Sequence, residues 1–336
     1  MSHSLKIDIY THILPIKYKE ALYKLASVNS AQKGRIDTLP TLFDLEQRFR
    51  VMDKYEGLRQ VLTLNYPPVE EIAGSGKAVD LAKLANDEMA ELVVKYPDRF
   101  AAAVACLPMN NMNAALKEVD RAINALGFRG VFMHTPINDK PPDSPELMPL
   151  YEKMCNYNLP IWIHPRRAAD YPDYRTESKS MYAIFGIFGW PYETTVAMSR
   201  LVYSGILEKY PELKIITHHC GGMVPYFEER IVGFHALQEL RGVAEYKQRM
   251  RKPLLDYFKM FYNDTALYGC TPGLMCAYAF FGADHMLFGT DTPHDNELGD
   301  RCIRETINSI EQMDVGDAER KKIFEANARR LLRLSI

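Results

Sequence analysis

Histidines of this chain gather directly after short runs of β-forming residues. His12, His164 and the adjacent pair His218 and His219 follow three such runs, and Asp291 ends another. Imidazole nitrogens with one carboxylate bind Zn²⁺ and other divalent ions, provided that the fold brings them together. These residue types and positions therefore predict a metal centre made of three strand-end histidines and Asp291.

The elements that would position these residues alternate along the chain. Segments 78–96 and 113–125 carry apolar residues at every third or fourth position, which is typical of helices. Runs such as 161–163 are apolar at successive positions, as in parallel strands that are buried on both faces. The predicted strands are 6–13, 58–64, 100–107, 130–134, 160–164, 214–219, 259–264 and 286–291.

Eight such strand–helix units predict an α/β fold, a closed (β/α)₈ TIM barrel that forms one domain over residues 1–336. The alternative is an open doubly wound sheet, but no GxGxxG follows the first predicted strand. Segments 17–43 and 166–193 are predicted to be long loop insertions between strand and helix, of the kind that often cover a site. Active sites of such barrels lie at the carboxyl ends of the strands, where the histidines fall.

The composition excludes several classes of partner. The chain has 41 Lys+Arg and 43 Asp+Glu, a formal charge of −2, so it shows no basic excess for nucleic acid or anionic membranes. No apolar stretch is long enough to span a membrane. The six cysteines form no CxxC pair, and residues 1–6 lack an apolar signal core, so we expect free thiols and a cytoplasmic location.

Several short motifs occur in a characteristic order along nearly the full chain. Through them the sequence resembles the amidohydrolase superfamily, in the branch of aminocarboxymuconate-semialdehyde decarboxylase and the hydroxybenzoate decarboxylases. The motifs are IDIYTHILP at 7–15, LPM at 107–109, LGFRGV at 126–131, IWIHP at 161–165, PYETT at 191–195, GILEKYP at 205–211, LKIITHHCGG at 213–222, YNDTA at 262–266 and FGTDTP at 288–293.

The resemblance implies a set of metal ligands. The first strand of the family carries Asp-x-His-x-His, and its second histidine corresponds to His12, while His164 and Asp291 match the ligands of later strands. Tyr10 occupies the position of the first histidine, and a phenol is a poor ligand unless the metal deprotonates it. Either Tyr10 binds as a phenolate, or the ion has three protein ligands plus water or substrate. Zn²⁺ is the expected ion, with Mn²⁺ as the alternative.

The resemblance also implies an acid/base histidine before a glycine-rich turn. Alignment of Gly221 and Gly222 favours His219 for this role. Because successive strand residues face opposite ways, only one of the two histidines should point inward. Its neighbour His218 is expected among the substrate-binding residues. Asp291 is the second expected catalytic group.

Substrate contacts are expected from three further side chains. Arg230 matches a family arginine that reaches a substrate carboxylate across a dimer interface, which implies a homodimer or a higher homo-oligomer. Arg166 is an alternative carboxylate clamp, because a guanidinium binds carboxylates bidentately. Trp190 lies among insertion aromatics that could stack on a flat ring.

These features together predict a metal-dependent, non-oxidative decarboxylase of a small aromatic or unsaturated hydroxycarboxylic acid. A hydrolase or hydratase that acts on a lactone, amide or enoic acid is the alternative, since one fold serves several reactions. A third interpretation, supported only by Tyr10, is a non-catalytic barrel that has lost its metal.

Overall fold

The strands of the protein are all parallel and follow one another in chain order. The computed structural model describes residues 5–336, with one group ordered β1-β2-β3 and a second ordered β4 to β8. Only Val104 separates β3 from β4, so the two are halves of one predicted run. The strands are β1 (Lys6–Ile13), β2 (Leu58–Leu64), β3 (Phe100–Ala103), β4 (Ala105–Cys106), β5 (Val131–Thr135), β6 (Ile161–Pro165), β7 (Ile215–Thr217) and β8 (Tyr262–Asn263).

Segment 286–291, the eighth predicted strand, closes the barrel without being a regular strand. The amide of Leu287 donates to the carbonyl of Asn263 on β8 (2.8 Å), and the amide of Ile9 on β1 donates to the carbonyl of Phe288 (2.9 Å). The segment therefore lies between the last strand and the first. Eight parallel segments with helices outside them form the (β/α)₈ barrel that the sequence predicts.

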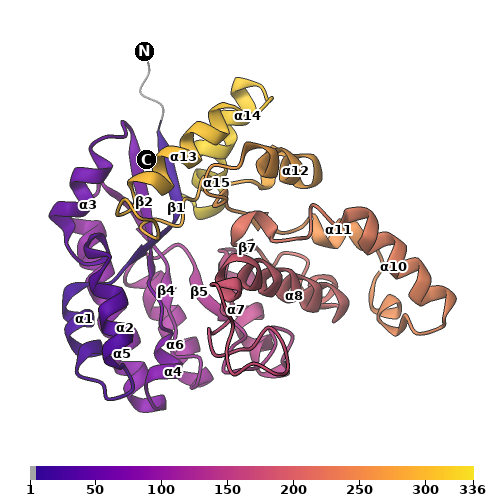
Figure 1. The fold of residues 1–336 in the computed structure, drawn as a ribbon, viewed down its shortest axis with the longest axis horizontal. Helices are drawn as coiled ribbons and strands as arrows, with labels where there is room; N and C mark the ends of the chain where they lie inside the picture. The colour runs from indigo at the N-terminus through magenta and orange to yellow at the C-terminus, as the bar shows by residue number, and fades with distance from the viewer. Residues whose placement is uncertain (1–4) are drawn as a thin grey trace.

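Helices cover the outside of the barrel (Figure 1). The helical prediction for 78–96 is confirmed by α5, which buries Leu81, Ala85 and Met89 on one face, and that for 113–125 is confirmed by α6. The α-helices are α1 (Ile16–Tyr23), α2 (Ser30–Asp37), α3 (Leu45–Met52), α4 (Val69–Ile72), α5 (Ser75–Lys95), α6 (Met112–Asn124), α7 (Met148–Tyr157), α8 (Trp190–Tyr203), α9 (Ile206–Lys209), α10 (Glu228–Leu240), α11 (Leu254–Phe258), α12 (Thr271–Phe281), α13 (Asp300–Glu311), α14 (Asp317–Lys321) and α15 (Asn327–Leu332).

The two long insertions differ in structure. Segment 17–43 is helical rather than a plain loop: it contains most of α1, then α2 and the short 3₁₀ turn η1 (Pro40–Leu42), and a capping box between Asn29 and Gln32 starts α2. Segment 166–193 remains irregular until the π-helical turn η3 (Phe185–Gly189) leads into α8. The remaining short turns are η2 (Pro145–Leu147), η4 (His219–Gly221), η5 (Glu245–Arg249), η6 (Ala283–His285) and η7 (Lys322–Ala326).

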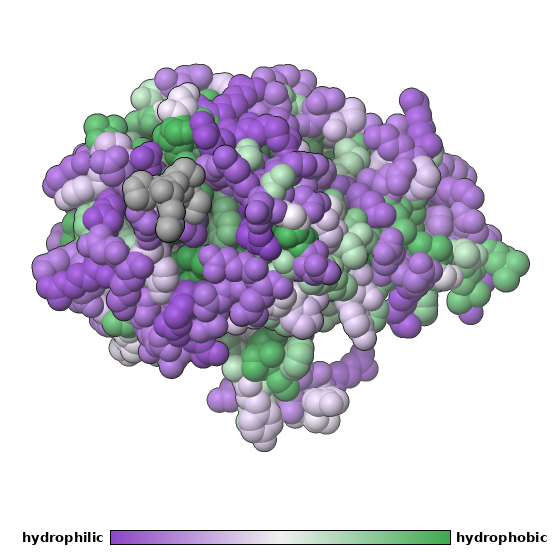
Figure 2. All heavy atoms as spheres, turned by 90° about the horizontal axis from the view of Figure 1, so that it is seen from above, coloured by the Kyte–Doolittle hydropathy of each residue, from purple (hydrophilic) through white to green (hydrophobic). Residues whose placement is uncertain are grey.

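Helix α10 extends away from the barrel as an arm (Figure 1). None of its residues is buried. Its exposed residues include the hydrophobic side chains of Phe234 and Leu240. Seen from above, hydrophobic residues gather at the end of the molecule to which this arm extends (Figure 2). Within residues 5–336, none of the helices combines the length and the apolar character needed to cross a lipid bilayer.

Candidate metal centre

The strand-end histidines continue the packing of the barrel interior. Ile216 on β7 belongs to the buried interior cluster, and His218 follows two residues later. Because side chains two residues apart share one face of a strand, His218 points toward the barrel axis at the carboxyl end. There the ligand atoms of four buried residues lie within 4.8 Å of one another: His12, His164, His218 and Asp291.

His12 is oriented by the hydroxyl of Thr63 on β2. That hydroxyl donates its proton to the Thr11 carbonyl (2.9 Å), so it accepts from Nδ1 of His12, which lies 3.2 Å away. Nε2 of His12 consequently faces Oδ1 of Asp291 at 3.1 Å. A cation between these two atoms satisfies both, and the hydrogen bond from Nδ1 is the usual support of a metal-binding histidine.

His164 is held as a neutral ring with its free nitrogen toward the cluster. Its Nδ1 lies 2.7 Å from the carbonyl oxygen of Pro165, and a carbonyl only accepts, so Nδ1 carries the proton. Burial, together with the charge of His218, lowers the pKa of His164 well below its usual value. Nε2 of His164 therefore presents a lone pair, as metal binding requires.

Asp291 supplies the negative charge of the cluster. Burial by itself raises the pKa of this carboxyl, but the positive charge of His218 outweighs burial and holds the pKa well below its usual range. The residue sits in the left-handed region with a φ of 64°. Such a conformation is uncommon outside glycine and is often found at functional sites.

His218 is paired with a second buried carboxylate, Asp264, which follows β8. Nδ1 of His218 is in short contact with Oδ2 of Asp264, whose Oδ1 accepts the backbone N–H groups of Cys220 (2.9 Å) and Ala266 (3.1 Å). Burial lowers the pKa of His218, but the charges of Asp264 and Asp291 outweigh burial and raise the pKa to about 9.

The other nitrogen of His218 lacks a protein hydrogen bond. Nε2 lies 3.4 Å from Oδ1 of Asp291 without hydrogen-bond alignment, and it is a buried polar atom with no hydrogen bond to any residue of 5–336. Buried polar atoms are normally satisfied, so this one indicates a missing ion, water or ligand. The residues at this end of the barrel thus fit a divalent cation.

His219 does not join the four-residue cluster. The chain leaves β7 at Thr217, stays extended at His218, and turns at His219, whose φ is 52°. The ring of His219 lies 3.8 Å from that of His218 and 6.4 Å from that of Trp190 (centroid distances). Alternation from Ile216, rather than the position of the glycine pair, indicates which histidine faces the axis.

Tyr10 lies below the cluster in the barrel interior and is fully buried. Its hydroxyl donates to the carbonyl of Ile163 (3.2 Å), and its ring stacks on that of His218. Burial and the nearby charges of Asp264 and Asp291 raise the pKa of the phenol well above its usual value.

The three predicted substrate contacts occupy different places. Trp190 lies at the cluster, with its ring centroid 6.1 Å from that of His164. Arg166 is already paired, with Nε 2.5 Å from the carboxylate of Glu71. Arg230 is exposed on α10, and its guanidinium stacks over the ring of Phe234 at 4.6 Å, away from the cluster of its own chain.

Asp264 and Thr63 support the site but are not among the residues predicted from the sequence. Both lie in or directly after strands of the barrel, at the end where the histidines gather. Position at a strand end is the only signal that could have identified them. Their contacts with His218 and His12 depend on neighbouring strands and are not visible in one strand's sequence.

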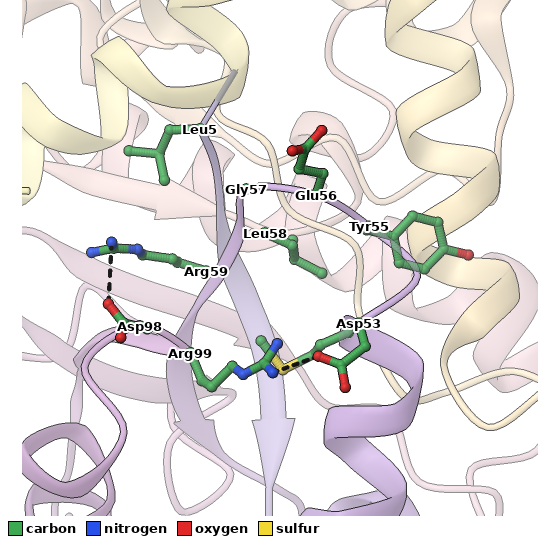
Figure 3. Close-up of a pocket in the computed structure, with 10 residues that line it drawn as sticks. Leu5, Asp53, Tyr55, Glu56, Gly57, Leu58, Arg59, Asp98 and Arg99 are labelled. Carbon is green, nitrogen blue, oxygen red and sulfur yellow. Dashed lines mark ion pairs between the residues drawn. The ribbon is translucent and has the colours of Figure 1, made fainter. Parts of the chain in front are cut away.

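A surface hollow of about 450 Å³ lies away from this cluster. It surrounds the amino ends of β1 and β2, and its arginines are both paired (Figure 3). Nη2 of Arg59 lies 3.6 Å from Oδ1 of Asp98, and Nη2 of Arg99 lies 2.5 Å from Oδ1 of Asp53. The amino end of a parallel barrel is also the end that does not carry the active site.

Comparison with known proteins adds independent findings. Residues 7–334 match the Amidohydrolase family model. A gamma-resorcylate decarboxylase of Polaromonas sp. (strain JS666 / ATCC BAA-500) is 33% identical over 306 residues, which cover 88% of this chain and 89% of that protein. A 2-keto-4-carboxy-3-hexenedioate hydratase of Sphingobium sp. (strain NBRC 103272 / SYK-6) is 28% identical over 274 residues, 76% of this chain and 72% of that protein.

A solved structure of a decarboxylase is also similar to this chain. The crystal structure of a dihydroxybenzoic acid decarboxylase from Polaromonas sp. JS666, with bound manganese and the inhibitor 2-nitroresorcinol, superimposes with a TM-score of 0.81. It is 30% identical, and the match covers 99% of this chain and 98% of that one.

Proposed function

Because this chain belongs to the amidohydrolase family and is an enzyme of the carboxy-lyase type, we propose that it releases the carboxylate of a small hydroxyaromatic acid as CO₂. The observation that carries the proposal is the buried cluster of three histidines and Asp291 at the carboxyl end of the barrel. The decarboxylase names of its relatives support the reaction, while the fold alone would not.

We propose His12, His164 and Asp291 as the residues that hold a divalent cation. When bound, the cation supplies positive charge that orients the carboxylate and an adjacent hydroxyl oxygen of the substrate. The manganese in the related structure makes Mn²⁺ the first ion to test, with Zn²⁺ as the second.

We assign the proton transfer to His218. Its proton would pass to the ring carbon that bears the carboxylate, forming a C–H bond. The C–C bond to the carboxylate then breaks, its electron pair returns to the ring, CO₂ leaves, and His218 regains a proton from water. Asp264 keeps the imidazole oriented through Nδ1. His219, which the alignment of the glycine pair favours, is the competing assignment and is tested in the same experiment.

Substrate placement is proposed for the aromatic and basic groups around the cluster. Trp190 would stack on the flat ring, since its indole is anchored by a hydrogen bond from Nε1 to the carbonyl of Arg167 (3.1 Å). Arg166 would reach a substrate carboxylate only after exchanging its partner Glu71.

A second copy of the chain is proposed to cover α10. The arm has no buried residue, and Tyr226 beside it is 79% exposed, which leaves an apolar surface for contact between subunits. Arg230 lies on this arm, and in a dimer it would reach the site of the other subunit.

The decisive assay offers purified protein loaded with Mn²⁺ a panel of acids that includes 2,6-dihydroxybenzoate, hydroxybenzoates and muconates. Loss of one CO₂ from the substrate mass supports the proposal. Loss of a general acid lowers turnover by about two to four orders of magnitude. We expect that loss for His218→Asn and a much smaller one for His219→Asn, and the reverse order would move the role to His219.

Hydration is the second candidate, because one relative is a hydratase. The same panel, extended with enoic acids and lactones, separates the two reactions. A product that gains the mass of one water, with no CO₂ released, would replace the decarboxylase proposal.

A further inference from the structure

We infer that Tyr10 is a positioning residue rather than a metal ligand, and that it joins the three strands that carry His12, His164 and His218. The inference rests on the proposed metal-dependent function and deepens it. It implies that the cation has three protein ligands and a position left open for substrate or water.

The hydroxyl of Tyr10 is committed to the backbone of β6. It donates to the carbonyl oxygen of Ile163 at 3.2 Å, and Ile163 directly precedes His164. A carbonyl oxygen only accepts, so this contact needs the phenol with its proton in place. A phenolate would instead set two acceptor oxygens against each other in a buried place, which is costly.

The ring of Tyr10 fixes the orientation of His218. The two rings lie parallel, with centroids 4.0 Å apart and planes inclined by 8°. Asp264 holds Nδ1 of the same imidazole from its edge. One contact restricts the tilt of the imidazole and the other its rotation, so together they direct Nε2 of His218 toward the cluster.

The absence of a side chain at Gly289 allows Tyr10 and Asp264 to pack close to this segment. A Cβ atom at that position would lie 3.2 Å from Cβ of Tyr10 and 2.8 Å from Cβ of Asp264, both closer than ordinary contact. Glycine therefore allows the segment before Asp291 to pack directly against both residues that orient His218. Tyr10 itself has no solvent exposure, so it is part of the packed interior.

The test compares Tyr10→Phe, Tyr10→Leu and Tyr10→Glu in the full chain. Tyr10→Phe keeps the stacked ring and removes the hydroxyl, whereas Tyr10→Leu removes the ring. Tyr10→Glu places a carboxylate where it could bind the ion. Mn²⁺ affinity is measured by titrating metal-free protein in the presence of a competing chelator. The d–d spectrum of Co²⁺-loaded protein reports directly on the ligand set.

We expect Tyr10→Phe to keep the Co²⁺ spectrum unchanged and the Mn²⁺ dissociation constant within about threefold, because no ligand is lost and the stacked ring that orients His218 remains. Tyr10→Leu should keep the metal but lower kcat about 10-fold or more with little change in KM, because the proton-transfer group is misoriented. Tyr10→Glu should tighten Mn²⁺ binding and change the Co²⁺ spectrum.

An altered Co²⁺ spectrum in Tyr10→Phe, together with weaker Mn²⁺ binding, would show that Tyr10 is a ligand and overturn the inference. Equal kcat values for Tyr10→Leu and the wild type would overturn the positioning role. Circular dichroism confirms that each variant is folded before it is compared, and Tyr10→Phe provides the test if Tyr10→Leu does not fold. Failure of the wild type to bind any divalent cation would refute the proposed function instead.

Discussion

Replacement of Asp264 by Asn tests the buried pair that orients and charges His218. Asn keeps an oxygen for the backbone N–H groups of Cys220 and Ala266, so the local turn is preserved. Its NH₂ group, however, faces Nδ1 of His218 in place of a carboxylate oxygen. Two N–H groups cannot share that contact, so the imidazole must lose the Nδ1 proton and with it the preference for the charged form.

The magnitude follows from the pKa of His218. Burial lowers this pKa, yet Asp264 and Asp291 raise it from 6.5 to about 9. At about 1.4 kcal/mol per pKa unit, that rise corresponds to about 3 kcal/mol in favour of the protonated ring. Without the Asp264 charge, burial dominates and the pKa falls.

The assay is the pH dependence of kcat for CO₂ release from 2,6-dihydroxybenzoate or another substrate of the panel. A general acid acts only while protonated, so activity of the wild type should fall as the pH rises through the His218 pKa. Asp264→Asn should move that fall to lower pH and reduce kcat at neutral pH by about two to four orders of magnitude.

Asp284→Asn is the matched control, because Asp284 is an exposed carboxylate paired with Lys322 far from the cluster. Metal content and circular dichroism should be equal in both variants. An Asp264→Asn enzyme with nearly normal kcat and an unshifted pH profile would refute the role given to the His218–Asp264 pair.

Four further outcomes are expected. Removal of the divalent ion by a chelator should lower Tm, since a ligand at about 100 times its dissociation constant adds about 2.7 kcal/mol, and an unchanged Tm would argue against the metal site. Burial raises the pKa of the Asp8 carboxyl to about 7, so the folded protein binds the carboxyl proton more tightly than the unfolded chain does. The stability that this proton contributes is therefore lost as the pH rises from about 4 to 7, and urea unfolding of Asp8→Asn should lack that part of the pH dependence. Gly289→Ala should destabilise the fold by about 1–3 kcal/mol through overpacking, whereas Gly34→Ala, with open space around its Cβ, should not; equal effects would contradict the packing argument. Arg230→Ala should raise KM without changing metal content, and light scattering should show more than one subunit; a monomer with normal KM would remove Arg230 from the site.

Much of the barrel was predictable because buried parallel strands carry a strong local signal. Runs such as 161–163 identify strands by themselves, and the apolar spacing of 78–96 identifies α5 within a few residues. Segment 286–291 is less regular, because it is held by bonds to β1 and β8 and not by its own conformation. The helices of 17–43 were missed because short helices depend on caps such as Asn29.

The candidate site was predictable in its residue types and only partly in its geometry. His12, His164 and Asp291 stand out as strand-end residues of metal-binding type, and the structure brings their ligand atoms together. The pair 218–219 could not be resolved from the glycines after it, since those glycines lie in a left-handed turn beyond both histidines and do not determine which ring faces the axis. The inward position of Ile216 places His218 in the four-residue cluster, while the catalytic role of His219 stays a prediction.

The sequence by itself determined the class of fold and the residue types of the site, because periodicity and residue type are local properties of the chain. It also showed that Tyr10 stands where an imidazole would be expected. Only the tertiary structure decided which groups Tyr10 and Asp264 contact, since their partners lie on other strands. A hydroxyl bond to Ile163 and a ring stacked on His218 arise only when the barrel closes, and closure is a long-range property that no single segment encodes.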